Sequence, residues 1–196
     1  MAKSPIPSKR DRHLQDLRKY APFDAELQNY LLAHSNLPGK RGNLWRIREA
    51  VAMAIQDLMA IDPAAVLAQL QEWADEADYL LQRAVVAGLA EPALMKHLDI
   101  AQAALAIHKK IIRQVEMAKN FKDADLQVLV QGLCYTLSVI ITGSADEGFS
   151  YLEELVNKEH PIIKRIAREN LNKNRLKVLN ESRVAALKAK IMRAEQ

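Results

Sequence analysis

The densest cluster of functional groups in the sequence lies near its C-terminus. Its cations could form an anion-contacting rim that faces phosphate, and they are Lys164, Arg165, Arg168, Lys173, Arg175 and Lys177. Phosphate contacts of this kind supply affinity without reading base sequence, and they weaken steeply as salt rises. The stretch also has a structural interpretation, in which Arg168 and Glu169 bond to neighbouring helices and Asn170 lies near a C-cap, opening a turn between helices. The sequence leaves both interpretations open.

A second set of candidates combines aromatic and charged side chains in the first half of the chain. We predict surface-binding roles for Trp73, Asp78, Tyr79 and Arg83. Stacking on nucleic-acid bases requires exposed aromatic side chains. Residues 152–196 contain no aromatic residue. Strong recognition of single strands is therefore not expected at the basic C-terminal end.

The patterns of common catalytic and metal sites are missing from the sequence. It has no Gly-x-Ser-x-Gly elbow, no phosphate-cradling glycine loop and no dinucleotide fingerprint. His97 and His108 would share a helix face, but at 1.5 Å per residue they are about 16 Å apart, too far for one metal ion. His108 falls on an apolar stripe and is predicted to be a core residue with a satisfied hydrogen bond. We expect no catalytic residue, metal, cofactor or small-molecule substrate.

Net charge is distributed unevenly along the 196 residues. Residues 1–21 hold six Lys/Arg and two Asp, a net charge of +4. Residues 22–157 hold eleven Lys/Arg and eighteen Asp/Glu, a net charge of −7, and residues 158–196 hold eleven Lys/Arg and four Glu, a net charge of +7. The basic ends could attract nucleic acid or an acidic partner, or could fold back on the acidic middle.

One apolar segment, Leu126 to Gly143, has no charged residue. As a helix it has no continuous polar face, so other helices or lipid must enclose it. Its length matches a minimal membrane span of roughly 18 residues, but amide side chains such as Gln127 and Gln131 are costly in hydrocarbon. We therefore predict a helix enclosed by protein, sealed from water on every side over residues 128–141, and no membrane partner.

The lone cysteine, Cys134, lies within this apolar segment and excludes an internal disulfide. Buried thiols resist ionisation, so a small hydrophobic role is predicted for it. The first thirteen residues contain no apolar core typical of a secretory signal. Together these features predict a cytoplasmic protein.

Apolar residues recur at steps of three and four along most of the chain, the spacing of amphipathic helices. Helices are predicted over residues 12–20 and 24–34, followed by a glycine- and proline-containing loop over 37–43. A boundary or kink is predicted near Asn180, where the stripe steps by five. Predicted helix starts are Asp24, Asn43, Asp62-Pro63, Pro92, Ser144 with Glu147 as a capping box, and His160-Pro161.

The expected fold class is therefore all-α, with about eight to ten helices joined by short loops. A globular bundle and a stack of helix pairs, such as HEAT repeats of about 40 to 47 residues, both suit this pattern. Residues 1–21 are expected to form a basic, partly disordered extension, and residues 22–196 a single helical domain.

Two segments carry a resemblance that favours the stack. The first, Leu67 to Leu94, contains Trp73-Ala74-Asp75 and an acidic turn. The second, Val128 to Leu176, ends in Arg-Glu-Asn-Leu at 168–171 and Lys-Asn-Arg-Leu at 173–176. Over about the last two-thirds of its length the chain resembles bacterial HEAT-like repeat proteins. That resemblance implies a right-handed superhelical stack of antiparallel helix pairs, a HEAT/ARM-like α-solenoid.

More distantly, the chain is similar to the DNA alkylation repair enzymes, which curve HEAT-like repeats around DNA. In that family an aspartate and aromatic residues act on the concave face. The candidates here are Trp45, Trp73, Asp75, Asp78 and Tyr79. The aspartate-containing motif of the family does not stand out in this sequence.

Two functional hypotheses follow. The preferred one is a non-enzymatic HEAT-like scaffold that binds a protein partner through its curved face, because solenoids offer extended concave surfaces. The alternative is a DNA-binding or DNA-repair protein that uses the basic C-terminal surface.

Overall fold

The computed structural model describes residues 41–194, and these residues form helices without any strand. The expected extension 1–21, the helices over 12–20 and 24–34 and the start of the 37–43 loop lie outside the described residues. The prediction of an all-α chain is confirmed. The described helices are α3 (Arg41–Met59), α4 (Pro63–Asp75), α5 (Tyr79–Leu89), the 3₁₀ helix η1 (Leu94–Lys96), α6 (Leu98–Glu116), α7 (Ala124–Ile140), α8 (Ala145–Val156), α9 (Pro161–Leu171), α10 (Asn174–Leu179) and α11 (Glu181–Ala194).

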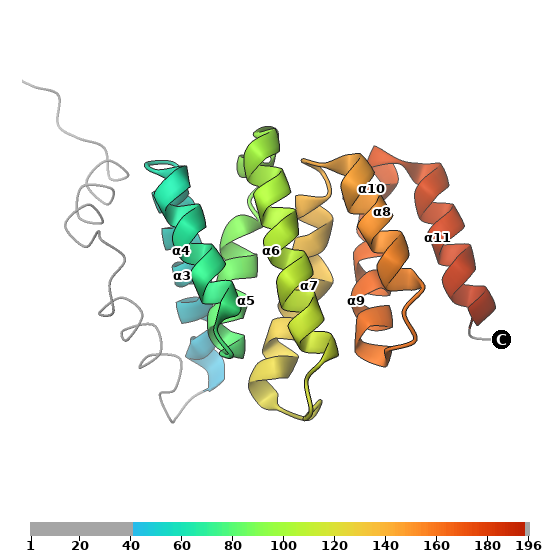
Figure 1. Cartoon of the computed structure of the whole chain (residues 1–196), viewed down its shortest axis with the longest axis horizontal. Helices are drawn as coiled ribbons and strands as arrows, with labels where there is room; N and C mark the ends of the chain where they lie inside the picture. Colours follow the sequence, from blue (N-terminus) through green and yellow to red (C-terminus); the bar gives the residue numbers. More distant parts are fainter. Residues whose placement is uncertain (1–40, 195–196) are drawn as a thin grey trace, which may run out of the picture.

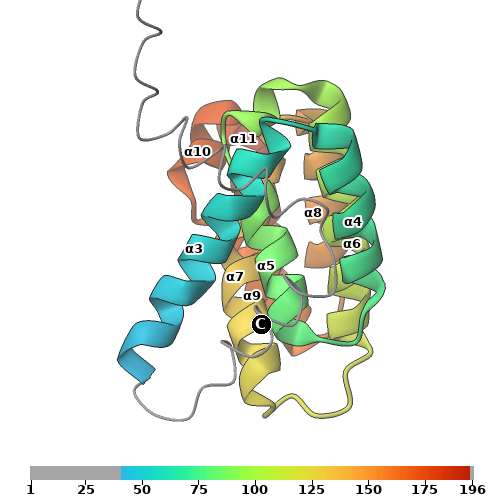
Figure 2. The ribbon, with the colours of Figure 1, turned by 90° about the vertical axis from the view of Figure 1, so that its left-hand side faces the viewer.

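The helices are arranged in two layers (Figures 1 and 2). Helices α3, α5, α7 and α9 lie side by side in the order of the chain and form the first layer. Helices α4, α6 and α8 cover one side of it and form the second layer. Helix α11 packs on α8 and α9 at the C-terminal end. Among residues 41–194, no second layer lies over the outer side of the first layer, where α10 contacts α7 and α9.

Aspartate side chains begin several of the helices. Asp62 accepts a hydrogen bond from the Ala65 amide at 3.1 Å, and Pro63 occupies the first turn as the sequence predicts. Asp78 caps α5 and Asp123 caps α7, each accepting from two backbone amides. These bonds satisfy amide groups that the first turn of a helix leaves without partners.

Some of the predicted helix starts are wrong. Helix α3 already begins at Arg41, so Asn43 lies inside it. Ser144 is the N-cap residue of α8, as predicted, but its side chain forms no capping bond. Pro92 lies in a turn before η1, and α6 begins only at Leu98. Packing explains the last difference, because a Cβ atom on Gly143 would lie 2.6 Å from the Met95 carbonyl oxygen. This close approach of η1 to the α7–α8 loop depends on tertiary structure.

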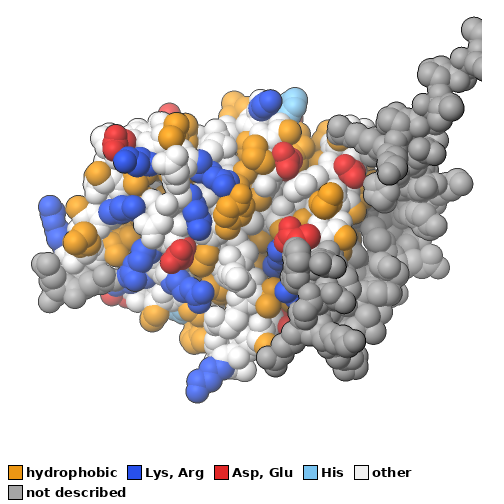
Figure 3. All heavy atoms as spheres, turned by 180° about the vertical axis from the view of Figure 1, so that it is seen from behind, with side chains coloured by type: hydrophobic (Ala, Val, Ile, Leu, Met, Phe, Trp, Pro, Cys, Tyr) orange, Lys and Arg blue, Asp and Glu red, His pale blue; other side chains and the backbone are white. Residues whose placement is uncertain are grey.

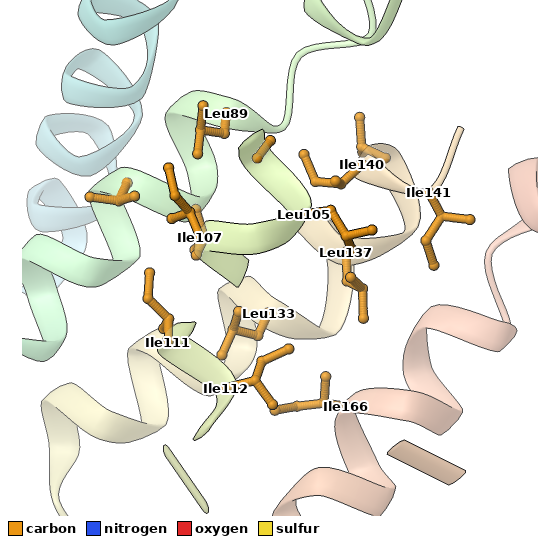
Figure 4. Packing of buried hydrophobic residues seen from close by; sticks show 14 of the residues in the cluster. Leu89, Leu105, Ile107, Ile111, Ile112, Leu133, Leu137, Ile140, Ile141 and Ile166 are labelled. Carbon is orange, nitrogen blue, oxygen red and sulfur yellow. The ribbon is translucent and has the colours of Figure 1, made fainter. Parts of the chain in front are cut away.

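Helix α7 lies at the centre of the core (Figure 4). Its Leu133 packs with Ile112 of α6 and Ile166 of α9, and all three side chains are buried. The prediction that residues 128–141 are sealed on every side is only partly correct. One stripe of α7, with Gln131 and Tyr135, reaches solvent because nothing in the second layer covers that side.

Two buried polar residues join neighbouring helices. His108 of α6 lies between the Ala104 carbonyl oxygen at 2.9 Å and the Thr136 hydroxyl at 3.0 Å, which confirms a core histidine with satisfied hydrogen bonds. Asn170 of α9 donates to the Leu133 carbonyl and accepts from the Ser138 amide, both at 2.8 Å. Asn170 is therefore an interhelical bridge and not the C-cap residue, a position that Asn172 occupies.

Candidate binding face on the first helical layer

A pocket of about 410 Å³ opens on the outer side of the first layer, where α3, α5 and α7 meet. Its volume lies within the range typical of ligand sites, roughly 300–1,000 Å³. Its floor is the open stripe of α7, and it exists because Ala52, Ala87 and Gly132 leave space between the three helices. The lining residues are Arg48, Glu49, Ala52, Met53, Gln56, Arg83, Ala87, Ala90, Val128, Gln131, Gly132, Tyr135 and Thr136.

One end of this face carries positively and negatively charged side chains that lie close together. The Arg83 guanidinium pairs with the Glu49 carboxylate at 2.8 Å and donates to the Arg48 carbonyl at 3.2 Å. Burial and the neighbouring Arg83 lower the pKa of Arg48. Burial, together with Asp123 and Asp78, raises the pKa of Asp125, which also interacts with Arg48. Near the start of α5 and α7 the face therefore carries both cations and several carboxylates.

The other end is basic and is centred on Tyr135, whose side chain is 48% exposed. Arg175 donates from Nη2 to the Tyr135 hydroxyl at 2.8 Å, and its Cζ lies 4.5 Å from the ring centroid. Lys173 Nζ lies 5.8 Å from the same centroid. Arg165 reaches the Gln127 amide oxygen at 3.4 Å. Figure 3 shows Lys and Arg side chains gathered over this C-terminal half of the face.

The predicted basic residues divide into two groups in the structure. Lys164 is bound to Glu159 at 3.1 Å with its side chain only 19% exposed, and Lys177 pairs with Glu181 at 3.2 Å. Lys173, Arg175 and Arg165 form no ion pair with any carboxylate of residues 41–194. Arg168 is exposed on α9, three residues after Arg165. The structure thus brings Lys173 and Arg175 together at one aromatic ring, Tyr135, and places Arg165 beside Gln127 of the same helix.

The other predicted surface residues do not form one site. Trp73 is 3% exposed and belongs to the core, so it is removed from the surface candidates. The Asp78 carboxylate caps α5, and Tyr79 packs partly buried against the core. Only Arg83 of this set lines the pocket. The side chain of Trp45 lies outside what the structure describes.

Tyr135 is a residue of the candidate site that was not among the sequence predictions. Gln131 and Tyr135 are four residues apart and therefore share one side of α7. Because most other residues of this segment are apolar, this polar pair was the sequence signal that one side of α7 could reach solvent.

Two side chains of types often used in catalysis, His108 and Cys134, are buried. Burial lowers the pKa of His108 to about 4, so its imidazole is neutral near pH 7. Burial raises the pKa of the Cys134 thiol, which disfavours the reactive thiolate. Among residues 41–194 no three His, Cys, Asp or Glu side chains lie close enough together to hold a metal ion.

No helix within the described part of the chain combines the length and apolar character needed to cross a bilayer. Comparison with protein-family models, with curated proteins and with solved structures found no match to this chain.

Proposed function

We propose that the chain is a non-enzymatic, HEAT-like α-solenoid that binds a protein partner through the outer side of its first layer. The alternation of successive helices between two layers is typical of solenoids, whose extended faces bind ligands. The single observation that carries the proposal is the pocket of about 410 Å³ lined by residues of α3, α5 and α7. A lone cysteine fits a reducing compartment, so the proposal places the protein in the cytoplasm.

Charge favours a protein partner over a nucleic acid. A duplex lying along the face would place phosphates over both of its ends. Lys173 and Arg175 lie at Tyr135. At the other end Glu49 and Asp125 interact with Arg48 or Arg83, and Asp78 lies near Asp125. Carboxylates at that end would repel a continuous polyanion, whereas a peptide can vary its charge along its length.

A pocket-filling variant tests this proposal. The Cβ atom added at Gly132 would meet only the Arg83 and Val86 side chains at 3.5 Å or more, so Gly132→Leu should fold and fill the pocket. Peptides selected from a random twelve-residue library on the unaltered chain should bind Gly132→Leu at least tenfold more weakly. Ser150→Leu, on the exposed surface of α8, adds the same side chain elsewhere and should bind normally. No selected peptides, or equal binding to Gly132→Leu, would contradict the proposal.

DNA binding is the second candidate, favoured by three cations beside α7, Arg165, Lys173 and Arg175, that have no carboxylate partner among the described residues. A duplex of 24 base pairs should then bind with an affinity that falls steeply with salt. The slope of log affinity against log salt should flatten by about two units in the double variant Lys173→Ala/Arg175→Ala. An absence of binding at low salt would remove this candidate.

A further inference from the structure

We infer that the ligand of this face is a peptide segment that places an apolar side chain in the α3–α5–α7 pocket and an acidic side chain against Arg175 and Lys173. This inference rests on the proposed function and adds the chemistry of the partner. Tyr135 connects the two parts, because it lines the pocket and also holds the cations.

The pocket is suited to an apolar side chain. Met53 stands at its edge with 62% of its surface exposed, and Ala52, Ala87 and Val128 supply further apolar walls. Methionine is flexible and polarisable, so it adapts to the shape of a bound group. Burying these carbons against a ligand removes apolar surface from water, which is the main favourable contribution to most protein association.

The cation cluster is suited to a carboxylate. Arg175 uses one hydrogen bond on the Tyr135 hydroxyl and stacks on its ring, which orients the guanidinium. A guanidinium carries five N–H donors in a rigid fork, so donors remain for a ligand. Lys173 Nζ lies beside the same ring. A carboxylate between these two cations would accept charge-assisted hydrogen bonds, which are stronger than neutral ones.

The charge asymmetry of the face also limits where acidic residues can lie in the ligand. Glu49 pairs with Arg83 at the opposite end of the pocket, and Asp125 interacts with Arg48 and with the nearby Asp123. Acidic ligand residues would be repelled there. The ligand should therefore carry its acidic residues on only one side of its apolar residue.

Labelled synthetic peptides test this chemistry on the full chain. The two probes are nine-residue glycine–serine peptides, each with one central leucine and three aspartates. In the first probe the aspartates precede the leucine, and in the second they follow it. The two control peptides replace leucine by alanine or the aspartates by lysines. One of the two probes should bind measurably by fluorescence anisotropy, and each control peptide should bind at least tenfold more weakly.

Charge reversal supplies the matching change in the protein. Lys173→Glu/Arg175→Glu should weaken binding of the acidic peptide at least tenfold and should bind the lysine peptide more tightly than the unaltered chain does. Lys188→Glu/Arg193→Glu changes net charge equally on exposed positions of α11 and should leave both affinities unchanged. Circular dichroism should give the same helix content for both variants.

The outcomes separate this inference from the proposed function. Library peptides that depend on Gly132 but lack acidic residues, and that bind the Lys173→Glu/Arg175→Glu chain normally, would overturn the inference alone. If no peptide binds, both are overturned. Tighter binding of a 24-base-pair duplex than of the acidic peptide at 0.15 M salt would replace the peptide by nucleic acid.

Discussion

Individual buried polar residues link the helices of this protein. Asn170 forms hydrogen bonds of 2.8 Å to the Leu133 carbonyl and the Ser138 amide of α7, and also to the Ile166 carbonyl of its own helix. Gln82 of α5 donates to the Glu76 carbonyl at 2.7 Å and to the side chain of Gln114 in α6. Buried polar groups without partners are costly, so such bridges tolerate few arrangements of the helices.

At the residue scale, the buried His108 leads us to predict how the stability of the fold depends on pH. Its pKa is about 4 in the folded chain because burial disfavours the charged imidazole, whereas its ordinary value is 6.5. Between these values the unfolded chain binds a proton that the folded chain excludes, so stability decreases as pH falls through this range. The loss should approach about 3 kcal/mol near pH 4 and be absent above pH 7.

Urea unfolding between pH 7 and pH 4 measures this effect. His108→Gln lacks the titrating group, so its free energy of unfolding should fall by about 3 kcal/mol less than that of the unaltered chain over this range. The carboxylates titrate in both chains and cancel in the comparison. Identical pH dependence in the two chains would show that His108 is not buried in its neutral form.

At the scale of elements, α7 determines both the core and the candidate site. The side that carries Leu126, Leu133 and Leu137 is completely buried among neighbouring helices. The opposite stripe, with Gln131 and Tyr135, is exposed and forms the floor of the pocket. The same helix therefore supplies hydrophobic stabilisation on one side and part of the candidate site on the other.

A pair of alanine substitutions tests this division of α7. Leu133→Ala should reduce the free energy of unfolding by about 2–5 kcal/mol, because it removes a fully buried side chain and leaves a cavity. Gln131→Ala, two residues earlier on the exposed stripe, should change it by less than about 0.5 kcal/mol. Denaturant midpoints measure both, and a similar small loss in both variants would mean that Leu133 is not enclosed.

At the scale of the whole molecule, the first layer has one open side and α11 closes the C-terminal end. Val184, Leu187 and Ile191 of α11 are buried against the rest of the chain, and α11 contacts both α8 and α9. Arg183 pairs with Asp146 at 3.2 Å, and Lys190 pairs with Glu153. Two cations of the last helix therefore meet carboxylates of α8, as expected if part of the basic C-terminus folds back on the acidic middle of the chain.

Removal of α11 should expose the end of the core. A chain ending at Asn180 loses three buried aliphatic side chains, each contributing about 1.5–3 kcal/mol, so its free energy of unfolding should fall by about 5 kcal/mol or more. Lys188→Ala, on the exposed side of α11, should have little effect. Thermal and urea unfolding measure the loss, and a truncated chain of unchanged stability would show that α11 does not close the core.

Much of the architecture could be predicted from local sequence, since its causes are local. Asp62-Pro63 and His160-Pro161 begin helices. Proline has no backbone N–H, and at the first helical position this N–H would have no partner within the helix, so its loss costs nothing. The step of five across Asn180 predicted the boundary between α10 and α11. The candidate site was less predictable. Lys173, Arg175 and Arg83 were identified as candidates, but the sequence could not predict how close they lie to Tyr135 and to the pocket.

The sequence by itself determined that the chain is helical and that α7 is largely buried, because periodicity and caps act over a few residues. Tertiary structure decided that Trp73 is buried, that Pro92 lies in a turn, and that one stripe of α7 reaches solvent. Each of these depends on which helices become neighbours. Residues far apart in sequence, such as Tyr135 and Arg175, meet only after α7, α9 and α10 have packed, so tertiary structure also decided where a binding face could form.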